Sequence, residues 1–201
     1  LTIITKYASK GGLDNLIKAG TLNNTKRQTI LSGICRGMML LHEHGYIHLD
    51  LNPSNVLIDE NGHPRINDFD VSISHEEQQQ EGVGSFFFMA PEVFIGNEEY
   101  DFRVDVFSFS ILMYQVVTGE SNTHDIGSPL NFLRSRDSGI RPEFKVPVKE
   151  SIKELIERCW SGDPDNRPTF GELFQKLSSD PDYFLDDIDA EDLKSYINSI
   201  K

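Results

Sequence analysis

Residues 46–70 read YIHLDLNPSNVLIDENGHPRINDFD, and this stretch decides the fold. The Asn-Gly pair at 61–62 predicts a two-residue type I′ hairpin turn, because both residue types tolerate the positive φ that this turn demands. With that turn Asn55 faces Asp68 across the strands, with Cβ atoms about 4.5–5.5 Å apart. Pro64 leaves open a longer loop and a register shifted by one residue. The stretch therefore predicts an amide and a carboxylate side by side at the open end of a β-hairpin.

An amide oxygen and a carboxylate are hard ligands that suit Mg²⁺, which takes its remaining ligands from phosphates and water. Asp50 precedes Asn55 by five residues, so a second carboxylate comes within reach of the same point. A metal-bound phosphate beside a free carboxylate is the arrangement that phosphoryl transfer needs, because the metal neutralises charge while the carboxylate orients the attacking hydroxyl. Asn and Asp also flank and cap turns without binding any ligand. The hairpin alone leaves both interpretations open.

The composition is that of a globular protein with a core. The 201 residues are 38% hydrophobic and 25% charged, and no apolar run approaches the roughly 18 residues that a membrane span needs. A net charge of −13 argues against nucleic-acid binding, which requires clustered Lys and Arg. Cys35 and Cys159 lack the spacing of a zinc site or a disulfide framework and are expected to be buried thiols. This pattern favours a reducing, cytoplasmic compartment and no membrane contact from this segment.

Hydrophobic periodicity predicts a mainly helical chain. A short helix is expected over 13–18, and a longer one is expected to begin at a capping box of Thr25 and Gln28 and to end at Gly45. Residues 105–119 are apolar on every side, which is typical of a central buried helix. Further helices are expected over 131–136, 150–159, 169–177 and 189–200, strands over 56–58 and 65–67, and a polar mobile loop or linker over 71–85.

The two ends of the chain differ from the middle. The first seven residues, LTIITKY, read as a β-strand without a preceding partner, so we expect the chain to be the C-terminal piece of a longer protein. Residues 180–201 contain seven acidic residues against two lysines. This tail is expected to be a surface helix packed on the domain or, alternatively, a docking segment.

Five motifs together resemble the eukaryotic protein kinases. HLDLNPSN at 48–55 is similar to their catalytic loop H-R-D-L-K-P-x-N, and DFD at 68–70 stands where the family has D-F-G. GSFFFMAPE at 84–92 resembles the end of the activation segment, and 105–119 resembles the central helix of the large lobe. CWSGDPDNRPTF at 159–170 matches the C-W-x-x-D-P-x-x-R-P-[ST]-F stretch of tyrosine kinases and tyrosine-kinase-like kinases.

The resemblance implies a fold and its divisions. It covers roughly residues 1–178 and implies a mainly α (α+β) chain built like the kinase large lobe, with a small catalytic hairpin and a residual hinge strand. Residues 1–12 would be the end of the small lobe and the hinge, 13–178 the large lobe, and 179–201 an acidic, helical C-terminal extension. The resemblance also implies a buried ion pair between Glu92 and Arg167, where a surface pairing is the alternative.

The resemblance further implies the roles of individual residues. Asp50 would be the catalytic base, and Asn55 and Asp68 would hold Mg²⁺. The stretch ITKYASKGGLDNL at 4–16 resembles the hinge that hydrogen-bonds the adenine of ATP. The residues expected there are Thr5 guarding the back pocket, Lys6 to Ala8 supplying backbone contacts, and Leu57 forming the floor.

Two features indicate the substrate class. Residues 52–54, Asn-Pro-Ser, are nearer the Ser/Thr form of the catalytic loop than the tyrosine-kinase form, and Ser85 stands where Ser/Thr kinases have a threonine. With the C-W-x-x-D-P stretch, this indicates a tyrosine-kinase-like kinase that phosphorylates Ser or Thr of a protein substrate. We expect a monomer that uses ATP and Mg²⁺.

Three residues depart from the family pattern. Leu49 replaces an arginine that pairs with a phosphorylated activation loop, which implies regulation without that pairing. Asn52 replaces a lysine that touches the transferring phosphate, and one such electrostatic donor is commonly worth about 3 kcal/mol. Asp70 replaces a glycine and restricts the backbone, and its extra charge either strengthens Mg²⁺ attraction or distorts the site.

These departures leave two functions open. The first is an active kinase, since Asp50, Asn55 and Asp68 are all present. The second is a pseudokinase, a scaffold or allosteric partner that keeps the fold with little catalysis. The glycine-rich loop, strand lysine and helix glutamate of the small lobe are absent from these 201 residues, so we expect no kinase activity from this chain alone.

Overall fold

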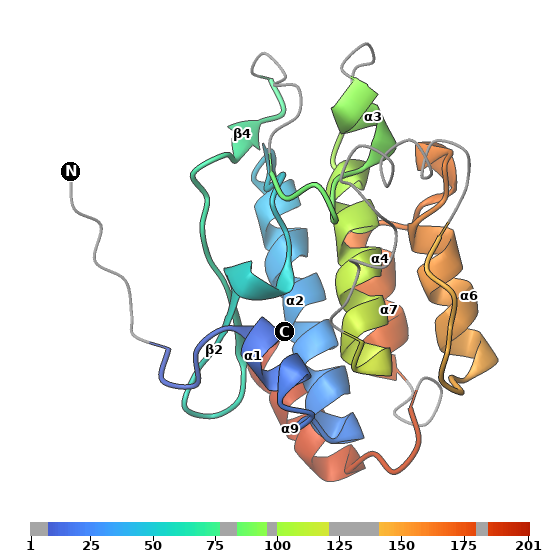
Figure 1. Cartoon of the computed structure of the whole chain (residues 1–201). Coiled ribbons are helices and arrows are strands. Elements are labelled where there is room, and N and C mark those ends of the chain that lie inside the picture. The colour runs from blue at the N-terminus through green and yellow to red at the C-terminus, as the bar shows by residue number, and fades with distance from the viewer. Residues whose placement is uncertain (1–7, 77–83, 96–99, 121–140, 180–184) are drawn as a thin grey trace.

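A computed structural model describes residues 8–76, 84–95, 100–120, 141–179 and 185–201 (Figure 1). Its helices are α1 (Leu13–Lys18), α2 (Asn24–Glu43), α3 (Pro91–Ile95), α4 (Arg103–Thr118), α6 (Glu150–Cys159), α7 (Phe170–Ser179) and α9 (Ala190–Ile200). Single-turn 3₁₀ helices are η1 (Pro53–Asn55) and η3 (Pro164–Asn166), and the strands are β1 (Tyr46–Ile47), β2 (Val56–Ile58), β3 (Pro64–Ile66) and β4 (Ile73–Ser74). The predicted mainly helical fold with a small β element is confirmed. No helix in the described ranges is long and apolar enough to cross a membrane.

Several expectations fall outside the described ranges. These are the opening strand at 1–7, the helix at 131–136 and the centre of the polar loop, 77–83. The helices expected over 13–18 and 150–159 have those bounds, whereas α7 and α9 each begin one residue later than expected.

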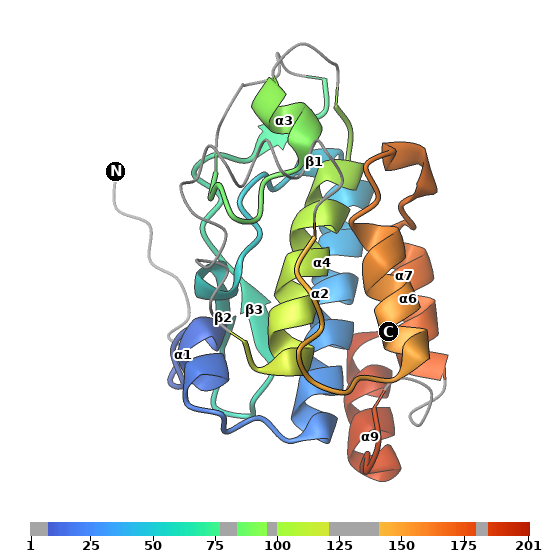
Figure 2. The same ribbon diagram turned by 45° about the vertical axis from the view of Figure 1, so that its right-hand side comes forward.

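The apolar helix α4 is the centre of the core. Residues 104–117 are all buried, and the helix ends at Gly119, whose φ of 75° is the left-handed conformation typical of a helix C-terminus. α4 packs against α6 on one side and contacts α2, while α2 packs against α7 (Figure 2). A helix covered all round matches a sequence that is apolar all round.

The start of α2 corrects the predicted capping box. The cap is Asn23, whose side chain accepts a hydrogen bond from the Lys26 N–H at 2.9 Å. Thr25 and Gln28 instead face the C-terminal part of the chain. The Thr25 hydroxyl accepts from the Asp189 N–H at 2.9 Å, and the Gln28 amide donates to a carbonyl of α7 at 3.0 Å. The capping-box prediction was wrong because both side chains are engaged by distant segments.

The β2–β3 hairpin is present with the longer loop and the one-residue shift that Pro64 left open, and not with the two-residue turn. The N–H of Asp59 donates to the carbonyl of His63, which closes a longer turn with Gly62 at φ 86°. Leu57 therefore faces Arg65, and the Asn67 N–H donates to the Asn55 carbonyl at 2.9 Å. Asn55 thus faces Asn67, and Asp68 lies one residue beyond the pair.

The carboxylate of Asp59 organises this turn. It is 2% exposed and accepts from the N–H groups of Asn61 and His63, each at 2.9 Å, and from the Arg65 guanidinium at 2.9 Å. Burial raises the pKa of Asp59, but these donors lower it more, so the pKa lies below its ordinary value. The ionised carboxylate of Asp59 therefore stabilises the turn through its hydrogen bonds.

A second small ribbon was not predicted. β1 pairs antiparallel with β4, with Ile47 opposite Ile73, at the start of the segment expected to be a loop. Both isoleucines are buried in the core, which anchors the chain on either side of the catalytic stretch.

Helix α9 packs on α2, so residues 190–200 of the acidic tail form a surface helix. Tyr196 lies over Gly33, where a Cβ atom would overlap the tyrosine hydroxyl, and its ring lies 4.3 Å from the ring of His63. Arg36 donates to the carbonyl of Ile200 at 2.8 Å. Burial raises the pKa of Tyr196 to about 12, so this side chain stays neutral against α2.

Candidate functional site

The backbone of residues 48–55, the expected catalytic loop, is held at its start by Asp105, near the start of α4. Its carboxylate is fully buried and accepts from the N–H of His48 at 2.8 Å and of Leu49 at 2.9 Å. The imidazole of His42 lies 2.8 Å from the same carboxylate. Sequence reasoning noted Asp105 only as the start of a helix, although a lone carboxylate in an apolar helix was the available signal.

Leu49, in the position of the family's arginine, is part of this arrangement. Its side chain is 6% exposed and belongs to the core, and its backbone has a φ of 64°. Left-handed backbone is costly for a bulky residue, and the two hydrogen bonds to Asp105 fix it. The apolar side chain contributes no charge to the activation segment.

Asp50 and Asn55 are brought together, as predicted. The Asn55 amide donates to Asp50 Oδ2 at 2.8 Å and to the Asp50 carbonyl at 2.9 Å. Asp50 Oδ1 accepts from the Ser85 N–H at 2.7 Å and from the Asn52 amide at 3.1 Å. Because its Nδ2 is engaged, Asn55 has Oδ1 as the atom that can face a metal ion.

The Asp68–Asp70 segment is more open. Asp68 is exposed with a φ of 65°, and Phe69 is 48% exposed with its ring 5.1 Å from the ring of His48. The His48 imidazole also lies 3.3 Å from the Asn67 carbonyl, which ties this segment to the catalytic loop. The left-handed residue is Asp68 and not Asp70, so the conformation does not require glycine at position 70.

Of the residues expected to contact adenine, Thr5 and Lys6 lie outside the described ranges. The segment that follows Ala8 runs antiparallel to β2, because the Ile58 N–H donates to the Gly11 carbonyl at 2.8 Å and Gly12 bridges to Leu57. Ala8 and Leu57 are both half-buried. The structure thus lays the expected hinge connector along the strand that carries the expected floor residue.

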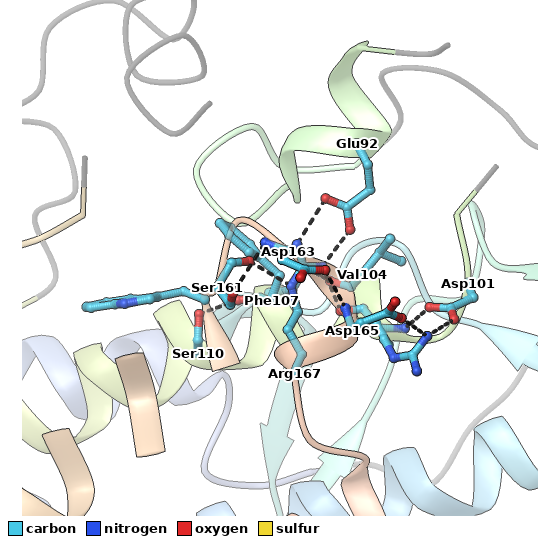
Figure 3. A network of polar contacts seen from close by, with 12 residues as sticks. Glu92, Asp101, Val104, Phe107, Ser110, Ser161, Asp163, Asp165 and Arg167 are labelled. Carbon is cyan, nitrogen blue, oxygen red and sulfur yellow. Dashed lines mark hydrogen bonds and ion pairs between the residues drawn. The ribbon is translucent and has the colours of Figure 1, made fainter. Parts of the chain in front are cut away.

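The ion pair of Glu92 and Arg167 is buried, which confirms the prediction over a surface pairing (Figure 3). Two guanidinium nitrogens meet the two carboxylate oxygens at 2.5 and 3.1 Å. Arg167 also donates to the carbonyls of Ser161 and Arg103, and its guanidinium lies 5.1 Å from the ring centre of Phe107. The pair therefore fastens the end of the activation segment to α4 and to the stretch before η3.

The donor set fits a magnesium ion that is shared with phosphate. Asn55 Oδ1 and the Asp68 carboxylate are hard oxygen ligands on adjacent segments. Within the described ranges, no three His, Cys, Asp or Glu side chains cluster as a metal cage. Such a site suits Mg²⁺, which usually keeps one or two carboxylates and completes its shell with phosphates and water.

Comparison with known proteins points in the same direction. Residues 1–177 match the sequence model described as protein kinase domain. The chain is 36% identical over 198 residues to Serine/threonine-protein kinase 12 of Arabidopsis thaliana, covering 89% of this chain and 41% of the relative. It is 34% identical over 192 residues to Serine/threonine-protein kinase VIK (88% and 43%) and 31% over 186 residues to Serine/threonine-protein kinase STY17 (89% and 32%), both of the same plant. The chain thus spans less than half the length of these relatives.

Proposed function

This chain belongs to the protein kinase family, and we propose that it supplies the catalytic carboxylate and the Mg²⁺ ligands of a serine/threonine kinase. The observation that carries the proposal is the Asp50 carboxylate, held by N–H donors from Asn52, Asn55 and Ser85. A carboxylate fixed in this way orients a substrate hydroxyl and accepts its proton, as phosphoryl transfer requires.

The metal ligands proposed are Asn55 and Asp68. A bound Mg²⁺ would neutralise charge that develops on the transferring phosphate. Asn55 links the two functions, because its amide nitrogen is engaged by Asp50 while its oxygen is available to the ion. Asp68 would bring the second oxygen from the segment that follows β3.

ATP is the proposed phosphate donor. Its adenine would lie along the hinge connector, with backbone contacts from Lys6 to Ala8, Thr5 at the back and Leu57 beneath. The antiparallel contact between residues 10–12 and β2 supports this placement, since it sets the connector beside the floor residue.

The proposed substrate is Ser or Thr of a protein, and the proposed form is a cytoplasmic monomer without nucleic-acid contact. The names of the three relatives given above, each a serine/threonine-protein kinase, support the substrate class. The net charge of −13 argues against nucleic-acid binding. The buried free thiols of Cys35 and Cys159 support a reducing compartment.

The alternative is a pseudokinase scaffold. It is favoured by three residues that depart from the family pattern, Leu49, Asn52 and Asp70. What favours catalysis is that each of these residues fits the site: Leu49 is packed, Asn52 binds Asp50, and Asp70 lacks the left-handed backbone that glycine would serve. An organised catalytic carboxylate would have no use in a scaffold.

The test uses the complete protein and measures Mg²⁺-dependent ATP binding and phosphate transfer to a protein substrate. Asp68→Ala is expected to abolish the Mg²⁺ dependence of binding, and Asp50→Asn to lower kcat by about 10²–10⁴-fold with binding retained. Glu154→Ala, an exposed carboxylate on α6, is the matched control and should leave both unchanged. ATP binding without any Asp50-dependent transfer would favour the scaffold.

A further inference from the structure

Asn52, which stands where the family has a lysine, contacts both Asp50 and Ser85. Asn52 is buried, with 5% of its surface exposed. Its amide nitrogen donates to Asp50 Oδ1 and to the Asp50 carbonyl, each at 3.1 Å. The same nitrogen donates to the hydroxyl of Ser85 at 3.2 Å. One amide thus joins the catalytic carboxylate to the activation segment.

The oxygen of the same amide has a separate task. Asn52 Oδ1 accepts from the N–H of Ser54 at 2.9 Å and of Asn55 at 3.2 Å, which caps the 3₁₀ turn η1. A lysine could donate to Asp50 and Ser85, but its ammonium has no acceptor for these N–H groups. The donor half and the acceptor half of Asn52 can therefore be separated by substitution.

Ser85 reaches Asp50 through a close backbone approach. Gly84 has a φ of 94°, and a Cβ atom there would overlap the carbonyl oxygen of Leu49. The Ser85 N–H consequently lies 2.7 Å from Asp50 Oδ1, the oxygen that Asn52 also contacts. The catalytic loop and the activation segment meet at this one atom.

The carboxylate of Asp50 has about four accepting positions, of which N–H donors from Asn52, Ser85 and Asn55 take three. The remaining position is the one through which Asp50 can accept a proton from a hydroxyl. Its direction is set by the other three, because rotation of the carboxylate would break them.

We propose that Asn52 is a positioning residue for the reaction, which orients Asp50 and ties it to Ser85 through its amide nitrogen. This inference rests on the proposed function. It assigns the residue that stands in place of the family's lysine a role in aligning the carboxylate, and it makes Ser85 the point through which the activation segment aligns that carboxylate.

The experiment measures kcat and the KM for ATP of the complete protein carrying single substitutions at position 52. In Asn52→Ala the carboxylate loses one tether, and kcat should fall about 10–100-fold while KM changes less than threefold, because misplacement of a reacting group by about 1 Å can cost about 10² in rate. Asn52→Lys keeps the donors and loses the cap, and its kcat should be at least tenfold above that of Asn52→Ala. Asn52→Asp keeps the cap, loses the donors and should be no better than Asn52→Ala.

A double-mutant cycle tests the link to Ser85. Ser85→Ala removes the hydroxyl but keeps the N–H bond to Asp50, and its effect on kcat should be largely absorbed in Asn52→Ala, so that the two effects are not additive. Glu154→Ala, an exposed side chain on α6 far from this loop in the sequence, is the control and should match the wild type.

The outcomes separate two failures. Wild-type protein without Asp50-dependent transfer would overturn the proposed function and this inference with it. An active wild type with Asn52→Ala of equal kcat, or with Asn52→Asp active and Asn52→Lys inactive, would overturn the positioning role alone. Independent, additive effects of Asn52→Ala and Ser85→Ala would overturn the link between the two segments.

Discussion

The two sides of the site are built in different ways. On the loop side, Asp50 accepts three N–H bonds from its own chain, and the backbone before it is fixed by buried Asp105. On the other side, Asp68 is exposed, its backbone is left-handed, and the neighbouring Phe69 is 48% exposed. The first side is organised by the fold before any ligand binds.

This difference fits the tasks proposed for the two sides. A group that orients a proton transfer acts best when its position costs nothing at the moment of reaction, which preorganised hydrogen bonds provide. A metal ligand gains its position from the ion, so it can remain exposed until the ion arrives. Substitutions on the loop side should therefore affect stability and rate together, whereas those on the Asp68 side should affect mainly metal-dependent binding.

The largest effect is expected from breaking the buried ion pair of Glu92 and Arg167, which fastens the end of the activation segment to α4. Arg167→Met leaves Glu92 as a buried charge without its partner and should lower the free energy of unfolding by about 3–5 kcal/mol. Denaturant unfolding measures this, with Arg158→Met, an exposed arginine of α6, as the matched control. A loss no larger than that of the control would mean that the ion pair does not anchor this region.

Asp105→Asn should have the next largest effect. One of the two acceptors becomes an amide donor that opposes the N–H of His48 or Leu49, and the loss of a charged, buried acceptor should cost about 2–3 kcal/mol. The kcat should fall as well, since the loop that carries Asp50 loses its support. Denaturant unfolding and kcat are measured on the same variant. A lowered kcat with an unchanged free energy of unfolding would contradict the expected joint loss of stability and rate.

Asp59→Asn is expected to destabilise the hairpin by about 1–2 kcal/mol at pH 7, because the buried carboxylate binds Arg65 and two N–H groups. The pKa of Asp59 is lowered in the folded protein, so this contribution is complete above the unfolded pKa of about 3.9 and is lost as the pH falls through the folded pKa. The difference between wild type and variant should therefore shrink below about pH 4. Urea unfolding at pH 7 and pH 3 checks it, and a difference that is as large at pH 3 as at pH 7 would contradict it.

The smallest effect on stability is expected on the open side. Asp70→Gly should destabilise the protein by about 0.4–1 kcal/mol, because glycine raises the entropy of the unfolded chain and the native φ gives it no advantage. Mg²⁺ affinity, measured in parallel with Asp70→Asn, reports the charge alone. A Gly variant more stable than the wild type would show that Asp70 is strained.

The sequence predicted what depends on neighbours in the chain. Helices α1, α4 and α6 appear where periodicity and Gly119 placed them, because burial of an apolar face decides them locally. The closeness of Asp50 and Asn55 also followed from a short separation in the same loop.

What was missed depends on contacts between distant segments. Thr25 faces Asp189, and Ser85 reaches Asp50 across more than thirty residues, so no local pattern announces either contact. The hairpin has the shifted register that Pro64 left open, and the two-residue turn is absent for a different reason. The Asp59 side chain supplies the turn with hydrogen bonds that an Asn-Gly pair does not reveal, and these lengthen it by one residue.

The packing of α9 against Gly33 shows that the folded domain extends beyond the family match. The family match stops at residue 177, yet Tyr196 occupies the surface of α2 beside the hairpin turn that leads to the proposed metal ligands. A recombinant protein trimmed to the homologous region would uncover a strip of α2 and free one flank of that hairpin. A boundary suited to expression and crystallisation therefore lies no earlier than Ile200, whereas the family match ends at residue 177.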